Sequence, residues 1–180
     1  MSALSKHRAE VEFFREHPGV AFDEGARHDQ EIEYQVEHWN DIVEELKPLF
    51  SQHWKELKEE HDIELNIDWE RYSQLDRLGK LHLVTARCDG WLIGYDTGLI
   101  LNDHLHYKGT LICNADVTWL LPKYRKGMIG YRMMKLFRDT AMAKGVKKMF
   151  AGCTTMRSLD ILYRRLGYKP RYILYSKVLP

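Results

Sequence analysis

Residues 120–137 read LLPKYRKGMIGYRMMKLF, and the fold is predicted from this stretch outward. An apolar run ends at Pro122, a short basic loop follows, and an amphipathic helix is predicted to begin at Ile129. The first N–H groups of a helix have no partner within the helix, and the helix dipole adds partial positive charge there. Because Arg125 and Lys126 lie beside those groups, the loop is suited to bind a ligand that carries phosphates.

The spacing of the glycines excludes two common phosphate-binding loops. Walker loops and dinucleotide fingerprints both need glycine patterns that this stretch lacks. The letters YRKGMIG instead resemble the acetyl-coenzyme A (acetyl-CoA) loop of the GNAT superfamily of N-acetyltransferases, with Arg125 at its first position and Gly130 at its last. Met128 stands where the family usually has glycine, and Gly127 comes one place earlier. Taken alone, the loop also fits an ordinary basic surface loop before a helix.

A second motif lies near the C-terminus. Residues 158–179 read SLDILYRRLGYKPRYILYSKVL, which predicts a helix that Gly167 ends, followed by an alternating strand. The residues from Tyr163 to Tyr168 resemble the C-terminal GNAT motif, in which a tyrosine precedes a charged pair and then Leu-Gly-Phe or Leu-Gly-Tyr. A tyrosine on the apolar face of a helix is more often core than catalyst. Two motifs in the right order, joined by a helix and a strand, favour the catalytic interpretation.

Composition limits the class of protein. A chain of 180 residues with 44% hydrophobic content and a net charge of +1 predicts one globular domain with a real core. Near-neutral charge disfavours a dedicated nucleic-acid binder. No apolar stretch is long enough to span a membrane, and the N-terminus is too charged for a signal peptide, so a cytoplasmic protein is expected. Three scattered cysteines without paired spacing predict neither a disulfide framework nor a metal site.

Hydrophobic periodicity and turn residues predict the remaining elements. A helical region over residues 38–61 contains Pro48, which is expected to bend it or break it into two helices. A short helix at residues 68–78 is predicted to be capped by Asp68. The other predicted elements are strands 81–87, 91–101 and 110–121, the first two forming a hairpin at Asp89-Gly90, then helix 129–144 and strand 147–153.

This order resembles the GNAT fold, which is of the α/β (α+β) class. The resemblance implies a central mixed, mostly antiparallel sheet that splays at the acetyl-CoA site and is flanked by helices. It covers residues 31–180 and leaves residues 1–30 as an N-terminal accessory segment. The letters DWERY, HLHY and LGY also resemble a subgroup of small GNAT proteins often encoded by bacteriophages. That narrower resemblance implies a location in the host cytoplasm.

The resemblance also implies a reaction and its catalytic groups. Acetyl-CoA would be the cosubstrate of an acyltransferase that moves the acetyl group directly to an amine of a small molecule, a protein lysine or a protein N-terminus. Tyr163 would protonate the departing thiolate. Asp116 is the carboxylate of strand 110–121 and is expected to share a face with Thr118 and Leu120, which makes it the candidate base. The alternative is an aspartate that caps or hydrogen-bonds a bulge.

The cofactor is expected to bind at the end of strand 110–121 and in the loop. The resemblance assigns these residues to it: Trp119, Leu120, Arg125, Lys126, Gly127, Met128, Ile129 and Gly130. Free backbone N–H groups near Trp119 and Leu120 would receive the carbonyl and the pantetheine arm. A covalent cysteine intermediate is not expected, because Cys113 and Cys153 are placed in apolar strands without an activating neighbour.

Several other residues have two interpretations. His104 and His106 share a predicted strand face, where they could serve as a second candidate base or as a metal pair. Further ligands at suitable spacing are lacking, so no metal is expected. Four aromatic residues fit either the acceptor pocket or the core: His53, Trp54, Trp69 and Tyr72.

Two rival functions remain open at this point. One is a GNAT-shaped protein, catalytically weak or inactive, that binds a host or partner protein. The other is nucleic-acid binding through the basic residues, which is ranked last. The expected partner is an amine acceptor, with no membrane, and a homodimer is a further alternative. The N-terminal segment is expected either to pack as an accessory helix or to mediate an interface.

Overall fold

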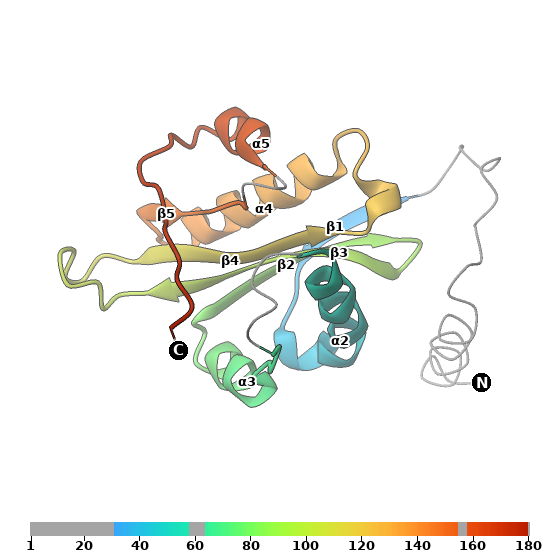
Figure 1. Ribbon diagram of the computed structural model, residues 1–180, viewed down its shortest axis with the longest axis horizontal. Coiled ribbons are helices and arrows are strands. Elements are labelled where there is room, and N and C mark those ends of the chain that lie inside the picture. Colours follow the sequence, from blue (N-terminus) through green and yellow to red (C-terminus); the bar gives the residue numbers. More distant parts are fainter. Residues whose placement is uncertain (1–30, 58–63, 155–157, 180) are drawn as a thin grey trace. The chain divides into compact units, whose positions relative to one another are not determined.

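The computed structural model describes residues 31–57, 64–154 and 158–179. Figure 1 shows the arrangement of the elements. In chain order they are β1 (Ile32–Val36), α2 (Trp39–Glu56), α3 (Trp69–Arg77), β2 (Leu81–Cys88), β3 (Trp91–Leu101), β4 (Ile112–Leu120), a 3-10 turn (Pro122–Tyr124), α4 (Ile129–Ala143), β5 (Lys148–Phe150) and α5 (Asp160–Arg165). The accessory segment expected at residues 1–30 lies outside the described residues.

The strands form one sheet in the order β1-β2-β3-β4-β5. Neighbouring strands are antiparallel except β4 and β5, which run parallel. Helix α4 covers one face of the sheet, and α2 and α3 cover the other (Figure 1). The prediction of a mixed, mostly antiparallel sheet flanked by helices is therefore confirmed.

Hydrophobic side chains fill both faces of the sheet. The cluster between the sheet and α4 includes Val84 and Met133, and the cluster under α2 and α3 is built around Trp39 and Tyr95. Every residue of β2 is buried, because this strand lies inside the sheet and has helices over both of its faces. The three polar residues of β2, His82, Thr85 and Arg87, are therefore buried as well, and each has a hydrogen-bond partner.

Local signals placed two elements correctly. The side chain of Asp68 accepts a hydrogen bond from the N–H of Arg71 at 2.8 Å and caps α3 as predicted. The β2–β3 hairpin turns at Asp89 (φ 50) and Gly90 (φ 82), and two residues with positive φ are what a tight hairpin turn of the primed type requires.

One prediction about the first elements was wrong. Residues 32–36 were not assigned to a strand, yet they form β1 and pair with β2 along the edge of the sheet. Pro48 was expected to bend the next helical region or break it into two helices, and it does not break it, since Trp39–Glu56 form the single helix α2. Pro48 lies on the exposed side of α2, so water can bond the Glu44 carbonyl that a proline cannot reach.

The strand predicted after Gly167 is also absent: the described residues 168–179 are not assigned to a strand. Tyr172, Ile173 and Leu174 are exposed over 78%, 79% and 95% of their surface. Alternation alone does not make a strand, because a strand also needs a neighbour for its backbone hydrogen bonds. The neighbouring β5 is three residues long, and Tyr172 meets it through a ring contact with Phe150 at 6.3 Å.

Candidate active site

The site lies where β4 separates from β5. The two strands pair only over three positions, from Ile112 with Lys148 to Asn114 with Phe150. Residues 115–120 of β4 therefore continue with β3 on one side and, among the described residues, without a strand on the other. This is the splay predicted for the sheet. It leaves backbone groups of β4 available to a ligand.

The N–H groups of β4 alternate in direction. Leu121 donates to the Ile93 carbonyl of β3 at 2.8 Å. By alternation along an antiparallel strand, the N–H of Trp119 points toward β3 and that of Leu120 toward the open edge. Of these two N–H groups, that of Leu120 is the one directed to the open edge, and the Trp119 residue lines the cavity.

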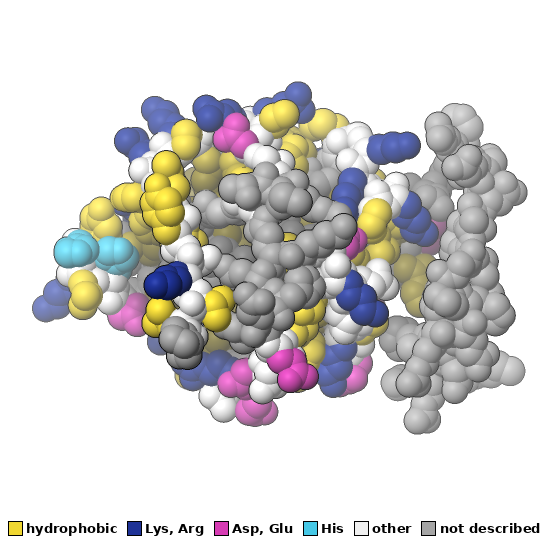
Figure 2. Space-filling view, in the orientation of Figure 1, with side chains coloured by type: hydrophobic (Ala, Val, Ile, Leu, Met, Phe, Trp, Pro, Cys, Tyr) yellow, Lys and Arg dark blue, Asp and Glu magenta, His cyan; other side chains and the backbone are white. Residues whose placement is uncertain are grey.

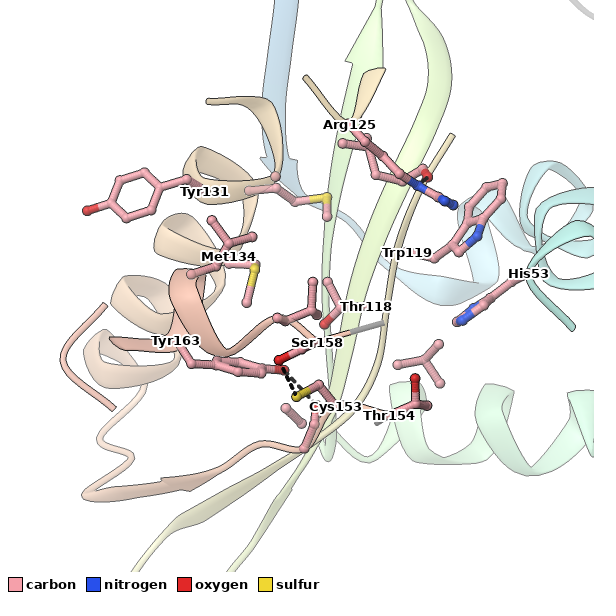
Figure 3. A pocket seen from close by; sticks show the side chains of 18 of the residues that line it. His53, Thr118, Trp119, Arg125, Tyr131, Met134, Cys153, Thr154, Ser158 and Tyr163 are labelled. Carbon is pink, nitrogen blue, oxygen red and sulfur yellow. Dashed lines mark hydrogen bonds between the residues drawn. The ribbon is translucent and has the colours of Figure 1, made fainter. Parts of the chain in front are cut away.

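A cavity of about 490 Å³ opens at the splay. Helix α2 contributes His53 to its wall, β4 contributes residues 115–120, and α5 contributes Tyr163 (Figure 3). The start of α4, the basic loop (residues 121–128) and the stretch after β5 complete the lining. A cavity of this size at the junction of several elements suits a substrate or cofactor.

The basic loop contains one residue in the left-handed backbone region. Gly127 takes a positive φ of 77°, which a side chain would strain, and Met128 takes a φ of −108°. The glycine that is displaced by one position, Gly127, is thus the left-handed residue of the loop. Met128 has a negative φ, so no glycine is required at its position. The first helical bond of α4 runs from the N–H of Arg132 to the Met128 carbonyl at 2.9 Å. The preceding N–H groups of α4, including that of Gly130, have no acceptor within the helix.

Arg125 turns away from the start of α4. Its Nε donates to the Leu120 carbonyl and its guanidinium pairs with Glu56 of α2, both at 2.7 Å. The guanidinium also lies 5.7 Å from the centre of the Trp119 ring. In this arrangement Arg125 closes one wall of the cavity, while Lys126 is exposed and does not line it.

Tyr163 projects from α5 toward the cavity wall formed by Cys153 and Ser158 (Figure 3). Its hydroxyl donates to the Gly152 carbonyl at 2.9 Å. Burial raises the pKa of the phenol, the buried Asp96 raises it further, and a hydrogen bond with Thr118 lowers it. The hydroxyl is therefore protonated at neutral pH, and its proton is bonded to the Gly152 carbonyl at the cavity wall.

No protein-family model and no curated sequence matches the chain. Solved structures do. An aminoglycoside acetyltransferase from an uncultured soil metagenomic sample, in complex with sisomicin, is similar with a TM-score of 0.64 and 14% identity over 83% of this chain and 97% of that one. A predicted acetyltransferase with acetyl-CoA from Clostridium acetobutylicum has a TM-score of 0.62 and 14% identity, over 82% of this chain and 96% of that one. A ribosomal-protein-alanine N-acetyltransferase from Brucella melitensis has a TM-score of 0.63 and 17% identity, over 83% of this chain and 99% of that one.

The fold is the GNAT fold. At 14% to 17% identity the likeness establishes the fold and leaves the activity to the chemistry of the site. Within the described residues of this GNAT fold, no three His, Cys, Asp or Glu side chains gather as a metal site would require. None of the described helices is long and apolar enough to cross a bilayer.

Asp116 lies in this GNAT fold at a bulge of β4. Thr97 pairs with Val117 and Gly98 with Ala115, so Asp116 is the extra residue between them. Its carboxylate accepts a hydrogen bond from the Tyr72 hydroxyl of α3 at 2.8 Å. The prediction that Asp116 shares a face with Thr118 and Leu120 was wrong, because the extra residue reverses the alternation: Thr118 bonds Asp96 on the α4 side. Asp116 is exposed and still lines the cavity.

The histidine pair lies elsewhere. β3 ends at Leu101, so His104 and His106 lie in the turn before β4 and not on a strand, as had been predicted. Histidine side chains gather on the surface over that turn (Figure 2), and these two rings are 5.7 Å apart. Neither residue lines the cavity, so the structure does not place them as a base for chemistry there.

The four aromatic residues with two interpretations divide between core and cavity. Trp69 and Tyr72 stack on the buried Trp39, with ring centres 6.0 and 4.3 Å from it. His53 lines the cavity and stacks on Trp119 at 5.8 Å. Trp54 is partly buried on α2 and is not part of the cavity wall.

The two cysteines also differ. Cys113 is buried in β4 as predicted, and burial raises the pKa of its thiol to about 12. Cys153 was placed in an apolar strand, but β5 ends at Phe150 and Cys153 is exposed on the cavity wall. Its sulfur lies 3.9 Å from the Ser158 hydroxyl.

Sequence reasoning missed Asp96 and Thr118. Asp96 is 2% exposed, and its carboxyl accepts a hydrogen bond from the Thr118 hydroxyl at 2.8 Å. One signal was present: the strand WLIGYDTGLIL is apolar on both sides of a single carboxylate. A charged residue in a strand that is buried on both faces needs a partner, and such groups are frequent at functional sites.

Proposed function

We propose that this protein is an N-acetyltransferase that moves the acetyl group of acetyl-CoA directly to an amine. One observation carries the proposal: the unpaired part of β4, the start of α4 and the Tyr163 hydroxyl all border the same cavity. Each feature suits one part of acetyl-CoA. The unpaired part of β4 suits the thioester carbonyl, the start of α4 suits the diphosphate, and the Tyr163 hydroxyl suits the sulfur that leaves.

The expected cofactor contacts follow from this placement. The free N–H groups at the start of α4, with Gly127 and Gly130, suit the diphosphate. The N–H of Leu120 suits the thioester oxygen, on which negative charge develops when an amine attacks. We expect Arg125 to contribute by closing the wall between the loop and α2, since its guanidinium is held by Glu56. Lys126 adds a further positive charge beside the diphosphate.

The proton transfers can be assigned to residues on two sides of β4. Tyr163 would give its proton to the thiolate of coenzyme A, since the raised pKa of the phenol keeps it protonated. Asp116 would accept the proton of the attacking amine, directly or through water. The Tyr72 hydroxyl orients the Asp116 carboxylate. Direct transfer avoids an acetyl-cysteine intermediate.

The acceptor is proposed as an amine, of a small molecule, a protein lysine or a protein N-terminus. The structurally similar proteins named above include one in complex with an aminoglycoside and one that is a ribosomal-protein-alanine N-acetyltransferase. A cytoplasmic location and the narrower resemblance to bacteriophage-encoded proteins stay predictions, since none of those three structures is described as coming from a bacteriophage.

A second candidate function is a GNAT-shaped protein that binds a partner without catalysis. The observation that favours it is the engagement of Arg125 with Glu56 and Leu120, which leaves the guanidinium turned away from the start of α4. Under this alternative the chain would bind acetyl-CoA weakly or not at all.

Calorimetric titration with acetyl-CoA separates the two functions, and Gly130 offers a sharp variant. A Cβ added at Gly130 would lie 3.9 Å from Leu120 and Leu162, which is ordinary contact, so Gly130→Ala fits the fold. Alanine also stabilises a helix relative to glycine by up to about 1 kcal/mol. Its methyl group enters the cavity wall where the diphosphate is expected. We therefore expect weaker acetyl-CoA binding with equal or higher thermal stability.

The matched control is Met142→Ala, which changes an exposed side chain of the same helix. It should leave acetyl-CoA affinity unchanged. Release of free thiol in the presence of an amine panel then tests turnover. Failure of the wild type to bind acetyl-CoA at millimolar concentration would rule out the enzyme and leave the binding protein.

A further inference from the structure

Asp96 lies beside the site but has no role in the acetyl transfer proposed above. It lies on β3 on the side of the sheet covered by α4 and is 2% exposed. A small cavity of about 10 Å³ separates it from Tyr163 and Tyr168. This space holds at most about one water molecule. Asp96 therefore cannot touch a substrate, and any effect on the reaction has to pass through a neighbour.

The neighbour is Thr118, whose hydroxyl lies between two groups. It donates to the Asp96 carboxyl at 2.8 Å, and it is also hydrogen-bonded with the Tyr163 phenol, which lowers the pKa of Tyr163. A hydroxyl has one proton to donate and lone pairs to accept. The Thr118 hydroxyl can therefore donate either to an ionised Asp96 or to the Tyr163 oxygen, but not to both at once.

The charge of Asp96 decides between these two orientations. Burial raises the pKa of Asp96 to about 7, and the Thr118 hydrogen bond opposes this. The ionisable groups around it are Tyr163, Tyr168 and, on β4, Cys113. Burial raises the pKa of all three groups, to about 12 for Tyr168 and Cys113. The positive charge of Arg138 on α4 lowers the pKa of Tyr168. Each of the three is neutral near pH 7, where Asp96 changes its charge.

We propose that Asp96 is a positioning residue for Tyr163 and acts through the Thr118 hydroxyl. The inference rests on the proposed acetyl transfer. With Asp96 protonated, its O–H donates to Thr118 and the Thr118 O–H donates to the Tyr163 oxygen. With Asp96 ionised, Thr118 turns to the carboxylate, and the nearby negative charge opposes a phenolate.

The proton balance of the step is complete without another acid. The Tyr163 O–H bond breaks and an S–H bond forms on coenzyme A, so the electron pair stays on the phenol oxygen. The Thr118 O–H stabilises that oxygen while it is charged. Asp116 takes the proton that the acetylated nitrogen releases and passes it to solvent water, and a proton from solvent then restores the phenol. Asp96 keeps its proton throughout and is not consumed.

The first experiment compares Asp96→Asn with the wild type at saturating acetyl-CoA between pH 6 and 9. The asparagine amide donates to Thr118 at every pH and cannot ionise. We expect the ratio of variant to wild-type kcat to rise about tenfold through pH 7, the scale of one hydrogen bond in the transition state. The ratio cancels the titration of the acceptor amine. A ratio that does not change with pH would overturn the proposal, even if both constants fell.

Variants of the threonine add a structural control. Thr118→Val should lower kcat about tenfold below pH 7 with the KM for acetyl-CoA unchanged, and Thr118→Ser should restore it. Thr97→Val makes the same change at a neighbouring buried threonine that bonds the Val117 carbonyl. It should reproduce any loss of stability without the loss of kcat. Equal effects of the two valine variants on kcat would assign Thr118 to packing.

A second measurement does not depend on turnover. The carbon-13 resonance of the Tyr163 phenol carbon reports its hydrogen bonding. In the wild type it should shift with pH near 7, and the shift should vanish in Asp96→Asn and Thr118→Val. If this shift is present but no amine is acetylated, the proposed function fails and the link from Asp96 to Tyr163 stands. If the resonance does not respond near pH 7, the inference fails whatever the activity.

Discussion

Replacing Asp96 by asparagine should change how the stability of the protein depends on pH. Asp96 is 2% exposed and has a pKa raised by burial from 3.8 to about 7. A raised carboxyl pKa means that the folded state holds a proton that the unfolded chain has already lost. The free energy of unfolding therefore falls as pH rises from about 4 to about 7, by up to about 1.36 kcal/mol per pH unit. Below and above that window, Asp96 adds no pH dependence.

The size of the effect follows from the difference between the two pKa values. That difference is about 3, which corresponds to about 4 kcal/mol over the whole window. Between pH 5 and 8 the change is roughly 2 to 3 kcal/mol. Asparagine cannot ionise and keeps a donor for Thr118, so the variant escapes this loss. The stability of Asp96→Asn relative to the wild type should therefore rise by roughly 2 to 3 kcal/mol from pH 5 to pH 8.

Urea unfolding followed by tryptophan fluorescence at pH 5, 6, 7 and 8 measures the difference, with Trp39 and Trp119 as buried reporters. Asp103→Asn, in the exposed turn before β4, controls for the lost charge. A difference between Asp96→Asn and the wild type that is constant over this pH range would refute the reasoning. It would mean that Asp96 is ionised throughout and that its burial is fully compensated.

Three further predictions concern separate parts of the molecule. Tyr163→Phe should lower kcat by about 100-fold or more with little change in acetyl-CoA affinity by calorimetry, because a general acid contributes to the transition state; an unchanged kcat would remove Tyr163 from the chemistry. Arg87→Met should cost about 3 to 5 kcal/mol in urea unfolding, since it leaves Glu37 and Glu45 without the buried guanidinium that they bond at 3.0 and 2.8 Å; a cost below about 1 kcal/mol would show that the cluster adds little. Mass spectrometry after incubation with acetyl-CoA alone should find Cys153 unmodified, and a stable acetyl group on its sulfur would replace direct transfer by a covalent route.

The elements that could be predicted from the sequence are those with local causes. The cap at Asp68 and the turn at Asp89 and Gly90 depend on a few adjacent residues, and both are present. β1 was missed because its short alternating segment becomes a strand only by pairing with β2, about fifty residues later in the chain. For the C-terminal segment the error was the reverse: a strand was predicted from its alternating pattern, but residues 168–179 are not assigned to a strand in the structure.

The candidate site divides in the same way. The position of Gly127 at a positive φ follows from the glycine in the basic loop, and the approach of Tyr163 to the cavity follows from the motif that contains it. Asp96 could not be assigned a partner from sequence, because Thr118 reaches it from the next strand through the register of β3 and β4. The ion pair of Arg125 with Glu56 joins residues 69 positions apart and is likewise a product of the fold.

The bulge at Asp116 has the largest consequence of the features that sequence could not supply. If β4 alternated regularly back from Thr118, position 116 would face α4 together with Thr118, and the two proposed proton-transfer groups would lie on one side of β4. With the bulge, Asp116 turns to Tyr72 of α3, while Thr118 and Tyr163 stay on the side of α4 and α5. An amine that approaches from the α3 side would meet a carboxylate, and a thiolate that leaves on the α5 side would meet a phenol. The separation keeps the acid from neutralising the base, and it follows from one residue inserted in one strand.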